Sequence, residues 1–171
     1  MTIPPLPAVT VTEADNVAYR MITGDQHLAS ADSDAYKQMT RSTGALVNPG
    51  LVMQYAIGQT TNATRKAIAN LYYRSVRILR AVEGGETIKT TTTVLGLADS
   101  KPKGNQHRGK VWLGIETSGD NGLIAQYERC ALVASRTGSP GHSAQIPGPS
   151  EPAPLEDLAA LTPTWDMSSS P

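Results

Sequence analysis

The sequence predicts an α+β domain in which one buried helix is wrapped by a curved antiparallel sheet. Two observations carry this prediction. Residues 50–66 form a largely apolar helix candidate that begins after Asn48 and Pro49, and residues 69–136 show only strand patterns. A helix with a broad apolar face must bury that face against another layer, and the strands that follow it supply the layer.

The N-terminal part predicts two short helices ahead of the buried one. Residues 1–9 are rich in proline and extended, with a short strand near residues 8–11. Thr12 is an N-cap candidate for a helix that ends at Gly24, with Val17, Met21 and Ile22 on one face. Residues 25–33 read as a polar loop, and Asp32 or Ser33 then caps a short helix that ends before Gly44.

Four main strands follow the buried helix. They are expected at residues 71–82, 87–99, 110–117 and 123–135, with a turn at 83–86, a polar loop at 101–108 and a hairpin at 119–122. After residue 136 the composition shifts to Gly, Pro, Ser and Ala, which cannot bury a core. We therefore expect a folded domain over residues 10–137 and a tail over 138–171, in which 155–161 forms at most one helical turn.

Composition argues against several classes of partner. Fifteen basic residues balance fifteen acidic ones, so the chain lacks the positive excess that nucleic acids and membrane surfaces select. One cysteine, Cys130, and three histidines argue against a zinc module and an internal disulfide. No apolar run is long enough for a membrane span, and we expect a cytoplasmic protein without a metal or other cofactor.

The start of the buried helix is the expected binding site. The backbone N–H groups around Gly50 and Leu51 are predicted to be unpaired at the positive end of the helix, where a carbonyl oxygen is most easily held. Asn48 and Tyr55 flank this point and are candidate substrate contacts. Four aromatic residues are expected to pack in the core or to line a binding tunnel: Tyr55, Tyr72, Tyr73 and Trp112.

Three stretches resemble one family. VTEADNVAYRMITGDQHLASADSDAY, LVNPGLVMQYAIGQ and ANLYYRSVRILRAVEGGETIKTTTTVLGL together resemble the MaoC-like hydratases of the hotdog superfamily. They are most similar to the mesaconyl-CoA hydratase and β-methylmalyl-CoA dehydratase branch, whose members often carry two such units in tandem. The resemblance covers residues 10–136 and implies a single hotdog domain, a dimer, and an active site near the subunit interface.

The family's loop motif, approximately G-D-x-N-P-L-H-x-D, is only partly kept in this chain. The resemblance implies that Asp25 is the catalytic aspartate and that Asp32 is the final one. His27 stands at the asparagine position, and Ser30 stands where the family has its catalytic histidine. The family's oxyanion donor, a backbone N–H at the start of the helix, falls on Gly50.

Three interpretations of this altered loop stay open at this point. His27 replaces the lost histidine and works with Asp25 as an acid/base pair. Alternatively, Asp25 alone or with Ser30 positions water or substrate. In the third interpretation the site is inactive, because a serine hydroxyl is a poor base without an activating neighbour, and the domain binds an acyl thioester or partners an active subunit.

The resemblance implies a hydratase or dehydratase that adds or removes water at a 2-enoyl or 3-hydroxyacyl thioester, carried by coenzyme A or an acyl-carrier protein. The alternatives are an impaired hotdog subunit or binding module in a heterodimer with a second hotdog chain, or a biosynthetic enzyme that uses the pocket for cyclisation or elimination. Five basic residues are expected either to contact coenzyme A phosphates or to be solvated at the surface. They are Arg65, Lys66, Lys101, Lys103 and Arg108.

Overall fold

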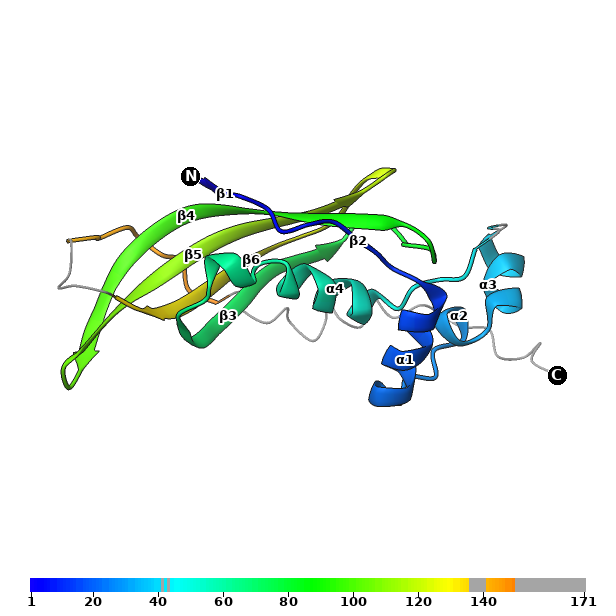
Figure 1. Cartoon of the computed structure of the whole chain (residues 1–171), viewed down its shortest axis with the longest axis horizontal. Helices are drawn as coiled ribbons and strands as arrows, with labels where there is room; N and C mark the ends of the chain where they lie inside the picture. Colours follow the sequence, from blue (N-terminus) through cyan, green and yellow to red (C-terminus); the bar gives the residue numbers. More distant parts are fainter. Residues whose placement is uncertain (41, 43, 136–140, 150–171) are drawn as a thin grey trace, which may run out of the picture.

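The computed structural model describes residues 1–40, 42, 44–135 and 141–149. It confirms the predicted α+β architecture, a central helix against a curved antiparallel sheet (Figure 1). In chain order the elements are β1 (Thr2–Ile3), β2 (Val9–Thr10), α1 (Glu13–Thr23), α2 (Leu28–Ala31), α3 (Ser33–Thr40), α4 (Pro49–Gly58), a 3-10 turn (Thr61–Ala63), β3 (Ala67–Ile78), β4 (Thr87–Lys103), β5 (Gln106–Gly119) and β6 (Gly122–Ala134).

The sheet has the strand order β1-β4-β5-β6-β3, with β2 paired to the edge of β4, and all pairs are antiparallel. The core lies between α4 and the inner face of this sheet. Val52 and Ala56 from the helix are buried, as are Ile88, Leu113 and Ile124 from the strands. Helices α1–α3 lie beyond one end of the sheet, next to the start of α4 (Figure 1).

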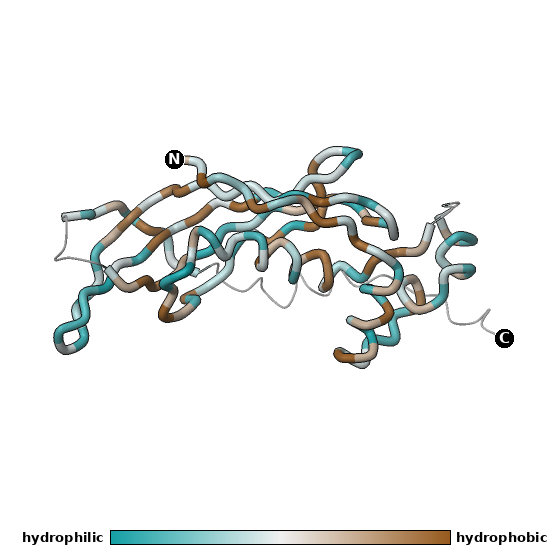
Figure 2. Tube along the Cα trace, viewed as in Figure 1, coloured by the Kyte–Doolittle hydropathy of each residue, from teal (hydrophilic) through white to brown (hydrophobic). Residues whose placement is uncertain are grey.

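The predicted start and end of α1 are confirmed. Thr12 and Asp15 form a capping box, in which each side chain bonds the backbone N–H of the other, and Gly24 ends the helix in a left-handed conformation with φ of 70°. The face that carries Val17, Met21 and Ile22 is exposed, at 51%, 81% and 85%. Figure 2 shows the end of α1 as a strongly apolar segment.

Removal of the Thr12 cap should destabilise the protein measurably. We expect Thr12→Ala to lower the free energy of unfolding by about 1 kcal/mol, because the Asp15 N–H loses its acceptor. Thr12→Ser keeps the hydroxyl and serves as the control. Urea unfolding measures both variants, and equal stability of the two would show that the cap contributes nothing.

The buried helix is shorter than predicted. It ends at Gly58, whereas the sequence predicted a helix that continues to residue 66. The hydroxyl of Thr60 donates to the Ile57 carbonyl at 2.7 Å, and that of Thr61 donates to the Gly58 carbonyl at 2.6 Å. These side chains satisfy carbonyls that a continuing helix would have bonded through its own N–H groups. The chain then turns through the 3-10 segment into β3.

The prediction of a polar loop at residues 101–108 is also wrong. β4 continues to Lys103 and β5 begins at Gln106, so only a two-residue turn joins them, with Gly104 at φ of 56°. The prediction failed because both faces of this hairpin end meet solvent, so its strands need no apolar alternation. The hairpin at residues 119–122 is confirmed, with Gly122 at φ of 93°.

β3 begins four residues earlier than predicted and ends at Ile78. Its pairing with β6 shifts register between Arg74 and Arg77, and Ser75 in this bulge has a positive φ of 51°. A bulge moves the residues beyond it to the other face of the strand, so the predicted unbroken alternation does not hold. β3 is an edge strand, paired only with β6 among the described strands.

Part of the predicted tail lies on the sheet. Ser143 bridges to Ala98 on β4, and the carbonyls of Pro147 and Gly148 accept hydrogen bonds from the side chains of Tyr72 and Arg74 on β3. The helical turn predicted at residues 155–161 lies outside the described residues, and the domain boundary at residue 137 stays a prediction. In the described part of the chain, no helix is long and apolar enough to cross a membrane.

Candidate active site

Asp25 lies where the chain leaves α1 and passes over the start of α4. The left-handed Gly24 turns the chain out of α1, and Arg20 holds the following loop through the carbonyls of Asp25 and Ala31. Buried Asn16 reaches the same region from inside. It donates to the Leu46 carbonyl at 3.0 Å and accepts the Asn48 backbone N–H at 2.8 Å. These bonds fix the Asp25 loop against the residues that precede α4.

The Asp25 carboxylate is the centre of a hydrogen-bonded cluster. Its Oδ2 accepts the Ser30 hydroxyl at 3.0 Å and the Asn48 side-chain N–H at 2.5 Å, and its Oδ1 accepts the His27 backbone N–H at 3.3 Å. Ser30 reaches Asp25 because the short helix α2, which the sequence predicted as loop, turns its hydroxyl back. The Ser30 bond is the largest cause of a lowered pKa at Asp25, against an opposing effect of burial.

His27 is placed differently from Ser30. Its side chain is exposed, and only its backbone joins the cluster, through the N–H bond to Asp25 and a carbonyl that accepts the Ser30 hydroxyl at 3.1 Å. Ser30, by contrast, is 8% exposed. Of the two candidate partners, Ser30 is the one whose side chain touches the Asp25 carboxylate.

The prediction of unpaired N–H groups at Gly50 and Leu51 is wrong in this structure. The Gly50 N–H donates to the Asn48 side-chain carbonyl at 2.7 Å, and the Leu51 N–H donates to the Asn48 backbone carbonyl at 2.9 Å. Asn48 acts as the N-cap of α4, which satisfies the first donors of the helix. Asn48 therefore links the Gly50 N–H directly to the Asp25 carboxylate.

Tyr19 is a site residue that the sequence analysis missed. A Cβ added at Gly50 would collide with the Tyr19 hydroxyl and lie 3.0 Å from Asn48 Oδ1, so glycine is required for this approach of α1 to α4. The available signal was spacing, because Asn16, Tyr19 and Arg20 lie three and four residues apart on one side of α1. That side faces the site, whereas the apolar residues Val17 and Met21 are exposed.

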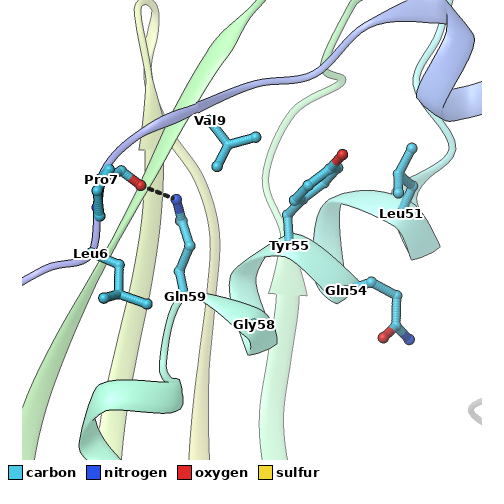
Figure 3. A pocket seen from close by; sticks show the side chains of 8 residues that line it. All are labelled: Leu6, Pro7, Val9, Leu51, Gln54, Tyr55, Gly58 and Gln59. Atoms are coloured by element: carbon cyan, nitrogen blue, oxygen red, sulfur yellow. Dashed lines mark hydrogen bonds between the residues drawn. The ribbon is translucent and has the colours of Figure 1, made fainter.

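Leu51 and Tyr55, both predicted substrate contacts, line a groove of 450 Å³ between α4 and the N-terminal segment. Figure 3 shows the Tyr55 ring between Leu51 and Gln59, with Leu6, Pro7 and Val9 on the opposite wall. Burial is the main cause of the raised pKa of the Tyr55 hydroxyl, with the Asp15 carboxylate adding to it. The groove is largely apolar and therefore suits a hydrocarbon chain.

A second cleft, of 360 Å³, lies on the other side of the same helix start. Pro49 and Val52 of α4 face Ile78 and Leu79 at the end of β3 across it. Tyr72, Tyr73 and Trp112 line neither cavity. Trp112 donates to Glu128 at 3.0 Å, while Tyr73 packs its ring against Tyr127. Among the described residues, no group of three or more His, Cys, Asp or Glu side chains is placed to hold a metal ion.

Comparison with known proteins finds a common family. The chain is 27% identical to mesaconyl-CoA hydratase of Cereibacter sphaeroides over 143 residues, which are 81% of this chain and 40% of that protein. A conserved Mycobacterium tuberculosis protein with a double hotdog fold superposes with a TM-score of 0.78 at 32% identity, covering 89% of this chain and 50% of that one. No protein-family model matches the sequence.

A MaoC-domain protein from Chloroflexus aurantiacus, described as a dehydratase, superposes with a TM-score of 0.79 at 25% identity, covering 92% of this chain and 44% of that one. This chain therefore spans half or less of the length of these proteins. The likeness confirms the predicted hotdog fold. The chain is similar to MaoC-like proteins of the hotdog superfamily, with mesaconyl-CoA hydratase among its relatives, as the predicted resemblance implied.

Proposed function

We propose that the chain is a hydratase or dehydratase that adds or removes water at a 2-enoyl or 3-hydroxyacyl thioester, with Asp25 as its acid/base group and Ser30 as the residue that orients it. The observation that carries this proposal is the contact of the Ser30 hydroxyl with the Asp25 carboxylate beside the first turn of α4. The similarity to mesaconyl-CoA hydratase supports the reaction class.

The Asp25 carboxylate has room for one further donor. An ionised carboxylate offers about four acceptor positions, and the cluster uses them for Ser30, Asn48 and the His27 N–H. We assign the remaining position on Oδ1 to the water that attacks the enoyl carbon. On hydration this oxygen takes a proton from the attacking water and delivers it to the α-carbon of the enolate. In the dehydration direction it removes that α-proton and returns it to the leaving hydroxyl.

The Asn48 side-chain carbonyl marks the place of the thioester oxygen. It lies 2.7 Å from the Gly50 nitrogen, within the range at which an oxyanion donor acts. In the proposed mechanism the thioester carbonyl displaces it, and the Gly50 N–H stabilises the enolate that forms as water adds. Asn48 keeps its bond to Asp25 and so couples substrate binding to the orientation of the base.

The pH profile tests Asp25 as the base. The pKa of Asp25 is lowered, so its carboxylate stays ionised as the pH falls through the neutral range, and the charge is lost only below the ordinary pKa of 3.8. We expect kcat/KM for crotonyl-CoA to stay flat from neutral pH down to about pH 5, in wild type and in His27→Ala alike. Stopped assays across this range measure the profile, and a fall in kcat/KM above about pH 5 in wild type would contradict Asp25 as the base.

A second candidate function is a binding subunit with an impaired site. Ser30 in the position of the family histidine favours it, as does the engagement of both helix-start N–H groups by Asn48. This candidate predicts that the purified chain hydrates no enoyl thioester but co-purifies with a second hotdog chain that carries the aspartate–histidine pair. Use of the pocket for cyclisation or elimination predicts turnover of a non-thioester substrate that survives Asp25→Ala.

A further inference from the structure

We propose that Arg65 and Lys66 of one copy of this chain bind an anionic group of the thioester held at the Asp25 site of a second copy. The inference rests on the proposed function, because it names how that site recognises its substrate. It follows from three features: two exposed cations with no acidic partner among the described residues, the edge strand that begins beside them, and the position of the two ends of that strand.

Arg65 and Lys66 have no structural role that explains them. Both are exposed, and no ion pair joins either one to a described residue. A cation in the last turn of a helix is stabilised by the helix dipole, but α4 ends at Gly58, seven residues before Arg65. The dipole falls off within one turn, so it does not account for this pair.

β3 is an edge strand built for association. It is twelve residues long, lies at the end of the sheet and is exposed over most of its length. Ile68, Leu71 and Val76 are 42–49% exposed on it, as are Ile78 and Leu79 at its end. A long exposed edge with apolar side chains is a template for pairing with another strand.

A second copy is the occupant that this edge fits. The Mycobacterium tuberculosis relative has a double hotdog fold, so two units of this kind lie in one molecule there, and this chain spans 50% of it. Identical copies associate through a two-fold axis, so the same strand meets itself. If this two-fold axis is perpendicular to the sheet, β3 of one copy lies antiparallel to β3 of the other. The two sheets then form one continuous sheet.

The two ends of β3 lie at opposite ends of α4. The strand begins at Ala67, directly after Arg65 and Lys66 and after the turn that follows α4. It ends at Ile78, which lines the cleft shared with Pro49 at the start of α4. Antiparallel pairing over the full strand therefore places Arg65 and Lys66 of one copy beside the Pro49 cleft of the other, next to Asn48, which contacts the Asp25 carboxylate.

This arrangement gives each site two basic side chains from its partner. Their charge is suited to a phosphate of coenzyme A or phosphopantetheine, or to a carboxylate on the acyl group. Crotonyl-CoA carries the phosphates alone, crotonyl-pantetheine carries neither group, and mesaconyl-CoA carries both. If the pair binds phosphate, Arg65→Gln/Lys66→Gln should raise KM about tenfold for both crotonyl-CoA and mesaconyl-CoA. If the pair binds the carboxylate, the variant should raise KM for mesaconyl-CoA alone. KM for crotonyl-pantetheine should not change in either case.

Lys101→Gln/Lys103→Gln is the matched control, because it removes the same charge. The sequence left these lysines open as coenzyme A contacts, but they lie exposed at the end of the β4–β5 hairpin, with β5 and β6 between β4 and the β3 edge, and the proposal gives them no role. We expect wild-type KM values for it. An increase in KM in this control and none in the Arg65/Lys66 variant would overturn the proposal.

A mixing experiment decides whether the cations act across the interface. Asp25→Asn is inactive by itself, and the Arg65→Gln/Lys66→Gln variant binds substrate weakly. After unfolding and refolding together, mixed dimers contain one site with the Asp25 of one chain and the intact cations of the other. The proposal predicts that about a quarter of all sites regain the wild-type KM. If every active site in the mixture keeps the raised KM, the cations act within their own chain and the proposal fails.

The outcome is separable from the proposed function. Turnover by wild type tests the hydratase assignment, whereas calorimetric binding of coenzyme A and of mesaconyl-CoA reports the cations without any chemistry. Weaker binding of either ligand to Arg65→Gln/Lys66→Gln, with the hairpin control unchanged, supports the anion site even where wild type is inactive. Unchanged binding of both ligands to the variant overturns it.

Discussion

Asp25→Asn should lower kcat for hydration of crotonyl-CoA about 100-fold or more, the scale expected for loss of an acid/base group. The substitution keeps the shape of the side chain but removes the charge that accepts the Ser30 and Asn48 donors. It also removes the only described carboxylate in contact with the Asn48 cap. Coupled assays of the purified variant against wild type measure the loss.

Asp34→Asn is the matched control for this prediction. Asp34 is an acidic residue on neighbouring α3 whose side chain is 85% exposed and pairs only with Lys37. We expect wild-type kcat for it. If Asp25→Asn retains kcat within a factor of about three, far less than an acid/base group contributes, Asp25 does not carry the chemistry.

Gly50→Ala should damage both the stability and the activity of the protein. The new methyl group collides with the Tyr19 hydroxyl and crowds Asn48 Oδ1, so the Tyr19 side chain, α1 or the cap must move. Overpacking of this kind costs about 1–3 kcal/mol, and a displaced carbonyl site should lower kcat about 100-fold. Thermal unfolding and the hydration assay measure the two effects on the same sample.

Gly58→Ala is the control on the same helix. A Cβ there meets nothing within 4 Å, so the substitution should leave stability equal or higher. Tyr19→Phe combined with Gly50→Ala removes the colliding hydroxyl and should recover much of the lost stability. A Gly50→Ala variant as stable and active as Gly58→Ala would show that the close approach of Tyr19 has no role.

The local features of the fold were predictable where a single residue type decides the backbone. Thr12 with Asp15 caps α1, Gly24 ends it, and Asp32 accepts the N–H groups that begin α3. Each follows from side-chain chemistry within four residues. The central helix and the long strands followed from apolar pattern and β-branched content in the same way.

One failure was local. The length of α4 was overestimated because the hydroxyls of Thr60 and Thr61 bond its last carbonyls, three residues back in the chain. The other failures depended on contacts between distant segments. The bulge at Ser75 left no mark on the alternation of β3, and the docking of residues 141–149 on the sheet was hidden by their composition.

The site was predictable in its members but not in its connections. Asp25, Ser30, Asn48 and Gly50 were all identified, yet the role of Asn48 as a bridge between Asp25 and Gly50 needed the structure. Tyr19 and Asn16 were missed because a tyrosine and an asparagine in a helix usually indicate packing and capping. Their function depends on where α1 lies relative to α4.

The central claim is that Ser30, and not His27, completes the Asp25 site. The most direct test is the hydration rate of crotonyl-CoA and mesaconyl-CoA by wild type, Ser30→Ala and His27→Ala. The structure predicts that Ser30→Ala lowers kcat about tenfold or more, through the lost hydrogen bond to Asp25, while His27→Ala stays near wild type. A loss of about 100-fold in His27→Ala with normal turnover by Ser30→Ala would contradict the claim and make His27 the replacement for the family histidine.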